Sequence, residues 1–146
     1  MAPLFGKHHD SDEPDLPRPV EMGAAIDEVV KRVAALTLEQ LAAEVMTANF
    51  KADYEPGGGS IGAGDVADQL MPPHDWPKLG DDVPQAQLVL QDLAAEALQL
   101  LEHAYLIRPK FGTSQGIGGF GYVTTRRGRT AIANNSVERV LTGGPL

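Results

Sequence analysis

The chain has 146 residues, 42% of them hydrophobic, a formal net charge of −8 and no cysteine. This length suits one domain around a single core and is too short for a protein kinase or a complete two-half dinucleotide-binding domain. The missing cysteine excludes disulfides, thiolate catalysis and cysteine-ligated zinc or iron–sulfur sites. No apolar run approaches the roughly 18 residues of a membrane span, and the first residues lack the apolar centre of a signal peptide, so we expect a cytoplasmic protein without a membrane segment.

The two ends of the chain differ in composition and charge. Residues 1–19 combine prolines with four acids in the stretch DSDEPD, which predicts a disordered acidic tail before one domain over 20–142 and a short tail over 143–146. Residues 1–107 hold 6 Lys or Arg against 19 Asp or Glu, a net charge of −13, whereas residues 108–146 hold 6 against 1, a net charge of +5. The protein is therefore acidic with one basic end.

Helical periodicity marks the start of the domain. Apolar residues recur every three or four positions over residues 21–35, which predicts an amphipathic helix. Thr37, followed by Gln40, forms a capping-box signature for a second helix that runs to about Asn49. Both helices are expected to bury one apolar face.

Two further helices are expected on either side of a proline-rich segment. YEPGGGS ends the second helix, and a short extended pair, Ser60 and Ile61, then precedes a two-turn helix over residues 63–70. PPHDWPKLGDD separates this helix from a long one that starts at Pro84 and ends near Ala104. The predicted buried stripe of the long helix consists of Ala86, Leu90, Leu93, Ala97, Leu101, Ala104 and Tyr105.

The sequence period changes after the long helix. YLIRPKF (residues 105–111) and FGYVTT (residues 120–125) are β-rich runs with the glycine-rich GTSQGIGG between them, which predicts a hairpin with a flexible tip. A helical pattern returns in RRGRTAIANNSVERVL and predicts a C-terminal helix. The basic end of the chain is therefore a hairpin followed by a helix.

The glycines of GIGGFGYV, residues 116–123, match the G-x-G-x-x-G-x-V loop of protein kinases, and the first six residues match a dinucleotide-binding fingerprint. A dinucleotide loop must open a helix, whereas YVTT after Gly121 favours a strand. A kinase needs a lysine and several aspartates, and the 25 residues after Gly121 contain neither. With no serine, zinc or paired-carboxylate catalytic motif either, we expect no cofactor and no enzymatic activity.

The histidines do not change this expectation. His8 and His9 lie in the acidic tail, and a metal site needs several fixed ligands that such a tail does not supply. His103 lies on the predicted exposed face of the long helix with no nucleophile motif beside it. No metal site is predicted.

The expected elements follow the order helix, extended pair, helix, long helix, strand, glycine-rich tip, strand. With LLEHAYLI at residues 100–107 and TTRRGRTAI at residues 124–132, this order resembles the winged helix-turn-helix superfamily. In that family a recognition helix exits into the wing, and the second wing strand closes with threonine, two residues, glycine and arginine. The resemblance covers about residues 37–133 and implies an α+β, mainly α fold, a winged helix-turn-helix with an extra N-terminal helix and a C-terminal helix.

The resemblance also implies a DNA-binding transcriptional regulator, whose wing contacts the phosphate backbone while the recognition helix enters the major groove. The cations expected to contact phosphates are Arg108, Lys110, Arg126, Arg127 and Arg129. Ser114 and Gln115 at the wing tip add neutral donors. Gln85, Gln87 and Gln91 of the long helix are the expected base readers, because glutamine pairs bidentately with adenine.

Two other interpretations of the basic end stay open. The segment before the long helix is proline-rich and carries Asp75, Asp81 and Asp82, which departs from the short turn of the family and repels DNA phosphates. One alternative is a solvated basic face, and the other is a winged-helix protein-interaction module that dimerises through the helix at 21–35. The candidate partners are therefore DNA, a second copy of the chain and another protein.

Overall fold

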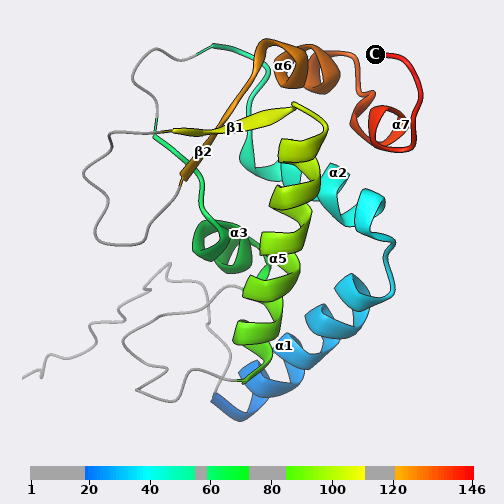
Figure 1. Ribbon diagram of the computed structural model, residues 1–146. Coiled ribbons are helices and arrows are strands. Elements are labelled where there is room, and N and C mark those ends of the chain that lie inside the picture. The colour runs from blue at the N-terminus through cyan, green and yellow to red at the C-terminus, as the bar shows by residue number, and fades with distance from the viewer. Residues whose placement is uncertain (1–18, 55–58, 73–84, 111–120) are drawn as a thin grey trace, which may run out of the picture.

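The computed structural model describes residues 19–54, 59–72, 85–110 and 121–146 (Figure 1). This part of the chain is mainly helical with a two-stranded antiparallel sheet, which confirms the expected α+β, mainly α class. Its elements are α1 (Pro19–Ala34), α2 (Leu38–Asn49), α3 (Ala63–Leu70), α5 (Gln85–His103), β1 (Ile107–Lys110), β2 (Gly121–Thr124), α6 (Arg126–Ala133) and α7 (Val137–Leu141). The predicted acidic tail up to residue 18 and the predicted wing tip with Ser114 and Gln115 lie outside the described residues.

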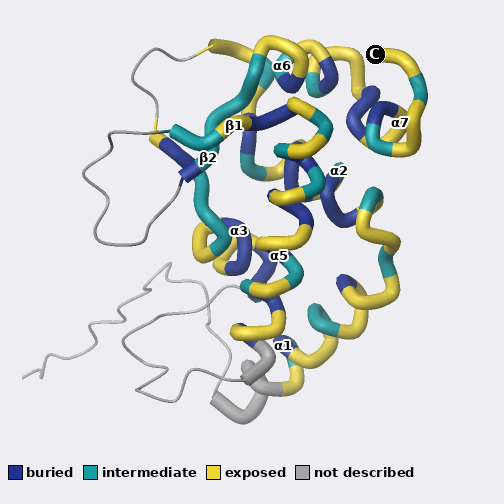
Figure 2. The backbone as a smooth tube through the Cα atoms, in the orientation of Figure 1, coloured by how far each residue is buried: buried dark blue, intermediate teal, exposed yellow. Residues whose placement is uncertain are grey.

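The long helix α5 runs through the middle of the molecule, and α1, α2 and α3 all pack against it (Figure 1). The predicted stripe is buried at Leu90, Ala97 and Leu101. Ala94 and Leu98 are buried as well (Figure 2), because helices cover α5 on more than one side. Removal of these apolar side chains from water supplies the main driving force for folding.

Local signals in the sequence set the starts of α2 and α3. The N–H of Thr37 donates to the Gln40 side chain at 3.0 Å, and the N–H of Gln40 donates to the Thr37 hydroxyl at 3.2 Å, which confirms the capping box. At the start of α3 the N–H of Gly62 donates to the Asp65 carboxylate at 2.8 Å. These bonds satisfy amide groups that a helix start leaves without partners.

Helix α1 packs against the domain instead of standing free. Ile26 and Val33 are buried, and α1 contacts α5. Arg32 also forms an exposed ion pair with Glu44 of α2 at 3.1 Å. Ile26 and Val33 thus belong to the chain's own core, while dimerisation through this helix stays a prediction.

The sheet consists of the predicted hairpin strands and one residue from farther back in the chain. β1 and β2 pair in a register that sets Ile107 opposite Thr124 and Lys110 opposite Gly121. On the other side of β2, Ile61 and Tyr122 exchange two backbone hydrogen bonds of 2.9 and 2.8 Å. The predicted extended pair at residues 60–61 therefore adds a third, very short antiparallel segment beside β2.

Gly121, the last glycine of the kinase-like string, is a close-packing residue. It is buried in β2, and a Cβ at this position would fall on the side chain of Ser60. Ser60 is itself 8% exposed, and its hydroxyl has no hydrogen-bond partner among the described residues. Gly121 thus lets the extended segment lie directly against β2, while Gly116 and Gly118 fall outside the described ranges.

The chain reverses direction at Tyr105, just after α5. Tyr105 has a left-handed backbone with a φ of 60°, and the N–H groups of Tyr105 and Leu106 donate back into the last turn of the helix, at 2.9 and 3.0 Å. Glycine usually takes this position in a Schellman motif. The prediction that Tyr105 extends the buried stripe is wrong: its side chain is 76% exposed, and Leu106 and Ile107 are buried instead.

The residues after β2 turn at once into a helix. Thr125 caps α6, and the first four residues of this helix include Arg126, Arg127 and Arg129. These arginines therefore lie on a helix beside the hairpin, not on the hairpin itself. The C-terminal helical pattern also divides into α6 and α7, since Asn135 between them has a φ of 51°.

Candidate functional site

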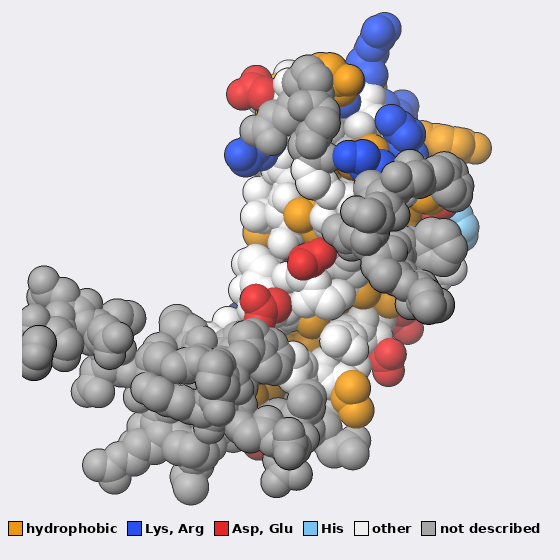
Figure 3. Space-filling view, turned by 90° about the vertical axis from the view of Figure 1, so that its left-hand side faces the viewer, with side chains coloured by type: hydrophobic (Ala, Val, Ile, Leu, Met, Phe, Trp, Pro, Cys, Tyr) orange, Lys and Arg blue, Asp and Glu red, His pale blue; other side chains and the backbone are white. Residues whose placement is uncertain are grey.

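A hollow of about 570 Å³ opens beside the sheet. Its walls come from the loop after α2, the extended segment at residues 59–61, both strands and the start of α6. Figure 3 shows most of the Lys and Arg side chains of this face at the end of the molecule that carries these elements. The hollow is therefore the candidate ligand-binding site.

The described lining residues carry five cationic side chains and one carboxylate. The cations are Lys51, Arg108, Lys110, Arg126 and Arg129, and the carboxylate is Asp53. Neither Arg108 nor Arg126 forms an ion pair with an acid in the described ranges. This concentration of positive charge on an otherwise acidic protein favours an anionic partner.

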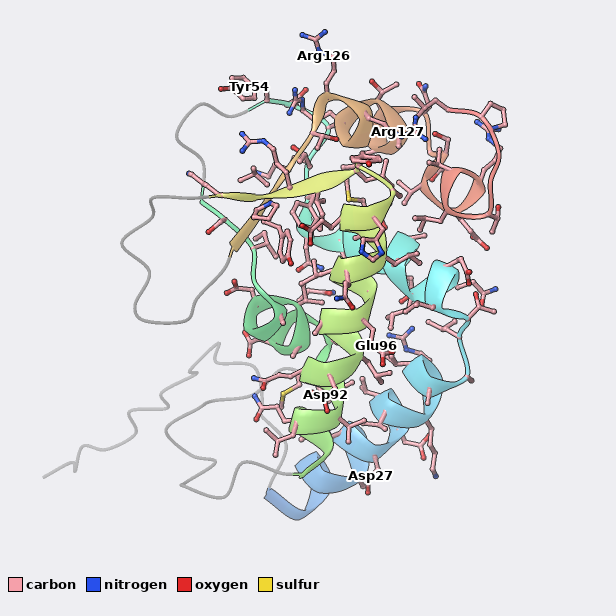
Figure 4. The ribbon with its side chains drawn as sticks, viewed as in Figure 1. Asp27, Tyr54, Asp92, Glu96, Arg126 and Arg127 are labelled. Atoms are coloured by element: carbon pink, nitrogen blue, oxygen red, sulfur yellow. The ribbon has the colours of Figure 1, made fainter. Side chains whose placement is uncertain are left out.

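Arg129 is held in place by two contacts. Its guanidinium lies 5.2 Å from the centroid of the Tyr54 ring, and one of its nitrogens donates to the carbonyl of Thr124 at 3.2 Å. Cation–π stacking and the carbonyl bond leave the other guanidinium donors available for a ligand. Arg126 projects outward from the start of α6 (Figure 4) and lines the hollow, whereas Arg127 does not line it.

Thr125 joins the start of α6 to the turn between α5 and β1. Its hydroxyl accepts from the N–H of Gly128 at 3.0 Å and shares its proton between the carbonyls of Tyr105 and Leu106. Its own N–H donates to the Leu106 carbonyl at 3.0 Å. A Cβ at Gly128 would collide with that same carbonyl and with Met46 of α2. Threonine, two residues and glycine are thus the spacing that brings the start of α6 onto the turn between α5 and β1.

Tyr122 forms part of the wall of the hollow from β2. Its hydroxyl donates to the carboxylate of Glu102 on α5 at 3.2 Å. Burial raises the pKa of Tyr122, and the neighbouring Glu102 carboxylate raises that pKa further. The phenol is therefore neutral across the physiological range and links the sheet to α5.

The glutamines proposed as base readers are not brought to the hollow. Gln87 is buried at 5% exposure, and its side-chain oxygen has no hydrogen-bond partner in the described part of the chain. Gln91 is half-buried, and the side chain of Gln85 falls outside the described residues. All three belong to the opposite end of α5 from the strands (Figure 1), and at 1.5 Å per residue Gln91 is about 18 Å from the end of the helix.

Sequence reasoning missed two residues of the hollow, Lys51 and Tyr54. Lys51 follows the expected end of the second helix, and Tyr54 is the first residue of YEPGGGS, which was interpreted only as a helix break. They reach the strands because Ile61, a few residues later, pairs with Tyr122. An aromatic and a cation next to a predicted edge segment are the signal that could have found them.

Comparison of the chain with protein-family models, curated proteins and solved structures gave no match. Among the described helices, none is both long and apolar enough to cross a membrane. The described side chains also form no group of three or more His, Asp or Glu that could hold a metal ion. The feature that bears on function is thus the hollow with its cations.

Proposed function

We propose that this chain is a winged-helix DNA-binding protein that contacts the phosphate backbone through β1, β2 and α6. The order of elements supports the winged-helix assignment: α2, the extended pair, α3, α5 and then the hairpin. The pairing of Ile61 with β2 adds the third sheet segment, and Thr125 and Gly128 supply a structural reason for the closing motif of the second wing strand. A role in transcription regulation stays a prediction.

The gathering of cations at one end carries the DNA-binding proposal. Arg108 and Lys110 on β1 line the same hollow as Arg126 and Arg129 on α6. Arg127, on the same helix and exposed, extends the basic surface. Lysine and arginine groups that neutralise phosphates release counterions, which is the dominant sequence-independent term in DNA affinity.

The proposed contact positions the protein on DNA and reads little sequence. Gln87 is buried, and the exposed side of α5 carries Asp92 and Glu96 (Figure 4), whose charges oppose entry into a groove lined by phosphates. Backbone contacts fix orientation without carrying sequence information. We therefore expect weak discrimination between DNA sequences.

The test is fluorescence anisotropy of the full chain with mixed-sequence duplex DNA over a range of salt concentrations. Four or five phosphate contacts give a slope of log affinity against log salt of about −4. Arg126→Ala/Arg127→Ala should reduce this slope to about −2. The matched control, Lys31→Ala/Arg32→Ala on α1, removes the same charge from two exposed surface ion pairs and should leave the slope unchanged.

Absence of binding at low salt, or an equal loss in both double variants, would remove the DNA-binding proposal. The alternative is then a winged-helix protein-interaction module. Tyr54 and Tyr105, which are 70% and 76% exposed, lie near the basic end, and exposed tyrosine is enriched at protein interfaces. In that case the cations would meet an acidic protein surface.

A further inference from the structure

The hollow is concave, whereas contact with a DNA backbone needs only an exposed basic surface. Its volume of about 570 Å³ lies within the range of about 300 to 1,000 Å³ typical of small-molecule sites. Contributions from four separate segments of the chain give it walls. The concave shape is therefore typical of a small-molecule site, whereas contact with a DNA backbone does not need it.

The lining combines basic with apolar residues. Arg108 and Arg126 supply guanidinium groups, and Phe50, Ile61 and Val123 supply apolar surface. Guanidinium groups match the oxygens of a phosphate in geometry and charge, while apolar surface favours a body without charge. This combination fits a molecule with an anionic head and an apolar or flat body.

The stacked pair of Tyr54 and Arg129 specifies the body of the ligand further. The Tyr54 ring is 70% exposed, although the Arg129 guanidinium covers it at 5.2 Å. A planar ring can extend such a stack at little entropic cost. An aromatic ring attached to the phosphate therefore suits this wall better than an alkyl chain.

The start of α6 favours the same anionic group. This helix has eight residues, and Thr125 and Arg126 at its start belong to the lining. The partial positive charge at a helix start adds to the side-chain cations. An anionic group bound next to Thr125 would therefore gain from both the helix start and the side-chain cations.

We propose that the hollow binds a small organic phosphate that carries an aromatic ring, of the size of a nucleoside monophosphate. The binding itself does not depend on DNA. Because Arg108 and Arg126 belong to both surfaces, the bound phosphate neutralises charges that DNA needs, so the ligand weakens DNA binding. This second, regulatory part rests on the proposed function.

The direct test is isothermal titration calorimetry of the full chain at physiological salt, with AMP, inorganic phosphate and adenosine as probes. AMP should bind at least about tenfold more tightly than either fragment, since only AMP contacts both the guanidinium groups and the aromatic stack. Arg108→Ala and Arg126→Ala should each weaken AMP binding by about fivefold or more. Arg127→Ala is the matched control, because it removes the same charge from α6 outside the hollow, and it should change AMP affinity by less than about twofold.

Tyr54→Leu distinguishes the contribution of the aromatic stack from that of the guanidinium groups. It keeps an apolar side chain but removes the aromatic ring, so AMP affinity should fall towards that of inorganic phosphate, while phosphate affinity stays the same. Thermal unfolding of each variant confirms that the fold is retained. Equal and weak binding of AMP and phosphate, or an equal effect of Arg126→Ala and Arg127→Ala, would overturn the proposal.

Displacement of labelled DNA by AMP tests the regulatory part. If AMP binds and the chain has no affinity for DNA, the DNA-binding function fails and the ligand site stands. If DNA binds with the expected salt slope and AMP does not bind, the ligand site fails and the DNA-binding function stands. Binding of both without displacement overturns the regulatory part alone.

Discussion

At the scale of single residues, two glycines fix how segments approach one another. Gly128 lies against the Leu106 carbonyl and the end of the Met46 side chain, so α2, the turn after α5 and α6 meet at this point. Gly121 plays the same part between β2 and Ser60. In both places the missing side chain matters for packing, since neither residue has a positive φ.

Gly128→Ala should lower the free energy of unfolding by about 2 to 4 kcal/mol, because the added methyl group collides with backbone that cannot move without displacing α6. Urea denaturation measures this change. Gly64→Ala is the matched control: Gly64 is exposed in α3 with open space around its Cα, and alanine there should stabilise the fold by about 0.5 to 1 kcal/mol. A stabilising effect of both substitutions would contradict the packing role of Gly128.

At the scale of elements, β2 and α5 are linked by the Tyr122 hydroxyl and Glu102. The folded state raises the pKa of Tyr122 above its ordinary value of 10.0, through burial first and Glu102 second. Folding therefore favours the protonated phenol. The resulting stabilisation is complete below pH 10 and disappears as the pH rises through the pKa of the folded state.

The link can be isolated by comparing wild type with Tyr122→Phe, which retains the ring but has no proton to lose. The wild type should lose stability more steeply above about pH 10, so the difference between the two proteins should shrink there. Urea midpoints at pH 7, 9 and 11 measure it, and Tyr105→Phe, at an exposed tyrosine, is the control. Parallel pH profiles for wild type and Tyr122→Phe would rule out the raised pKa.

The elements show which structural features a sequence can predict. The bounds of α3 and the start of α2 follow from local apolar spacing and caps such as Thr37. The pattern from Arg126 onward indicated a helix, but its division into α6 and α7 depends on the left-handed backbone of Asn135, and the placement of α6 depends on Thr125 reaching a carbonyl about twenty residues earlier. Periodicity reveals neither feature. Tyr105 was misassigned for a related reason: helical spacing continues past the residue at which the chain adopts a left-handed turn.

At the scale of the whole molecule, part of the site was predictable. Segment charge alone pointed to the basic end, and Arg108, Arg126 and Arg129 do share one hollow. Gln87, which was expected to be exposed as a base reader, is buried, because α1, α2 and α3 pack against α5 and cover positions that a single apolar stripe leaves exposed. Tyr54 was missed because its place depends on pairing between distant segments.

The packing of α1 against α5 predicts that this helix stabilises the folded chain. Ile26→Ala should lower the free energy of unfolding by about 2 to 4 kcal/mol, because Ile26 is fully buried and its loss leaves a cavity. Glu28→Ala, on the exposed side of the same helix, should change it by less than about 0.5 kcal/mol. Urea denaturation measures both, and analytical ultracentrifugation should give the same mass for each. If Ile26→Ala kept the wild-type stability but had a lower mass in solution than the wild type, this result would instead support a dimer formed through α1.

The separation of charge has a consequence for how the protein meets a partner. Figure 4 sets Arg126 and Arg127 at one end of the molecule and Asp27 at the other, with Asp92 and Glu96 between them. Such an arrangement gives the protein a large electric dipole along its length. In the field of a polyanion the molecule turns before contact, with its basic end inward and its acidic body outward, so fewer encounters are wasted in the wrong orientation. Added salt would then slow association by shortening the distance over which this alignment acts.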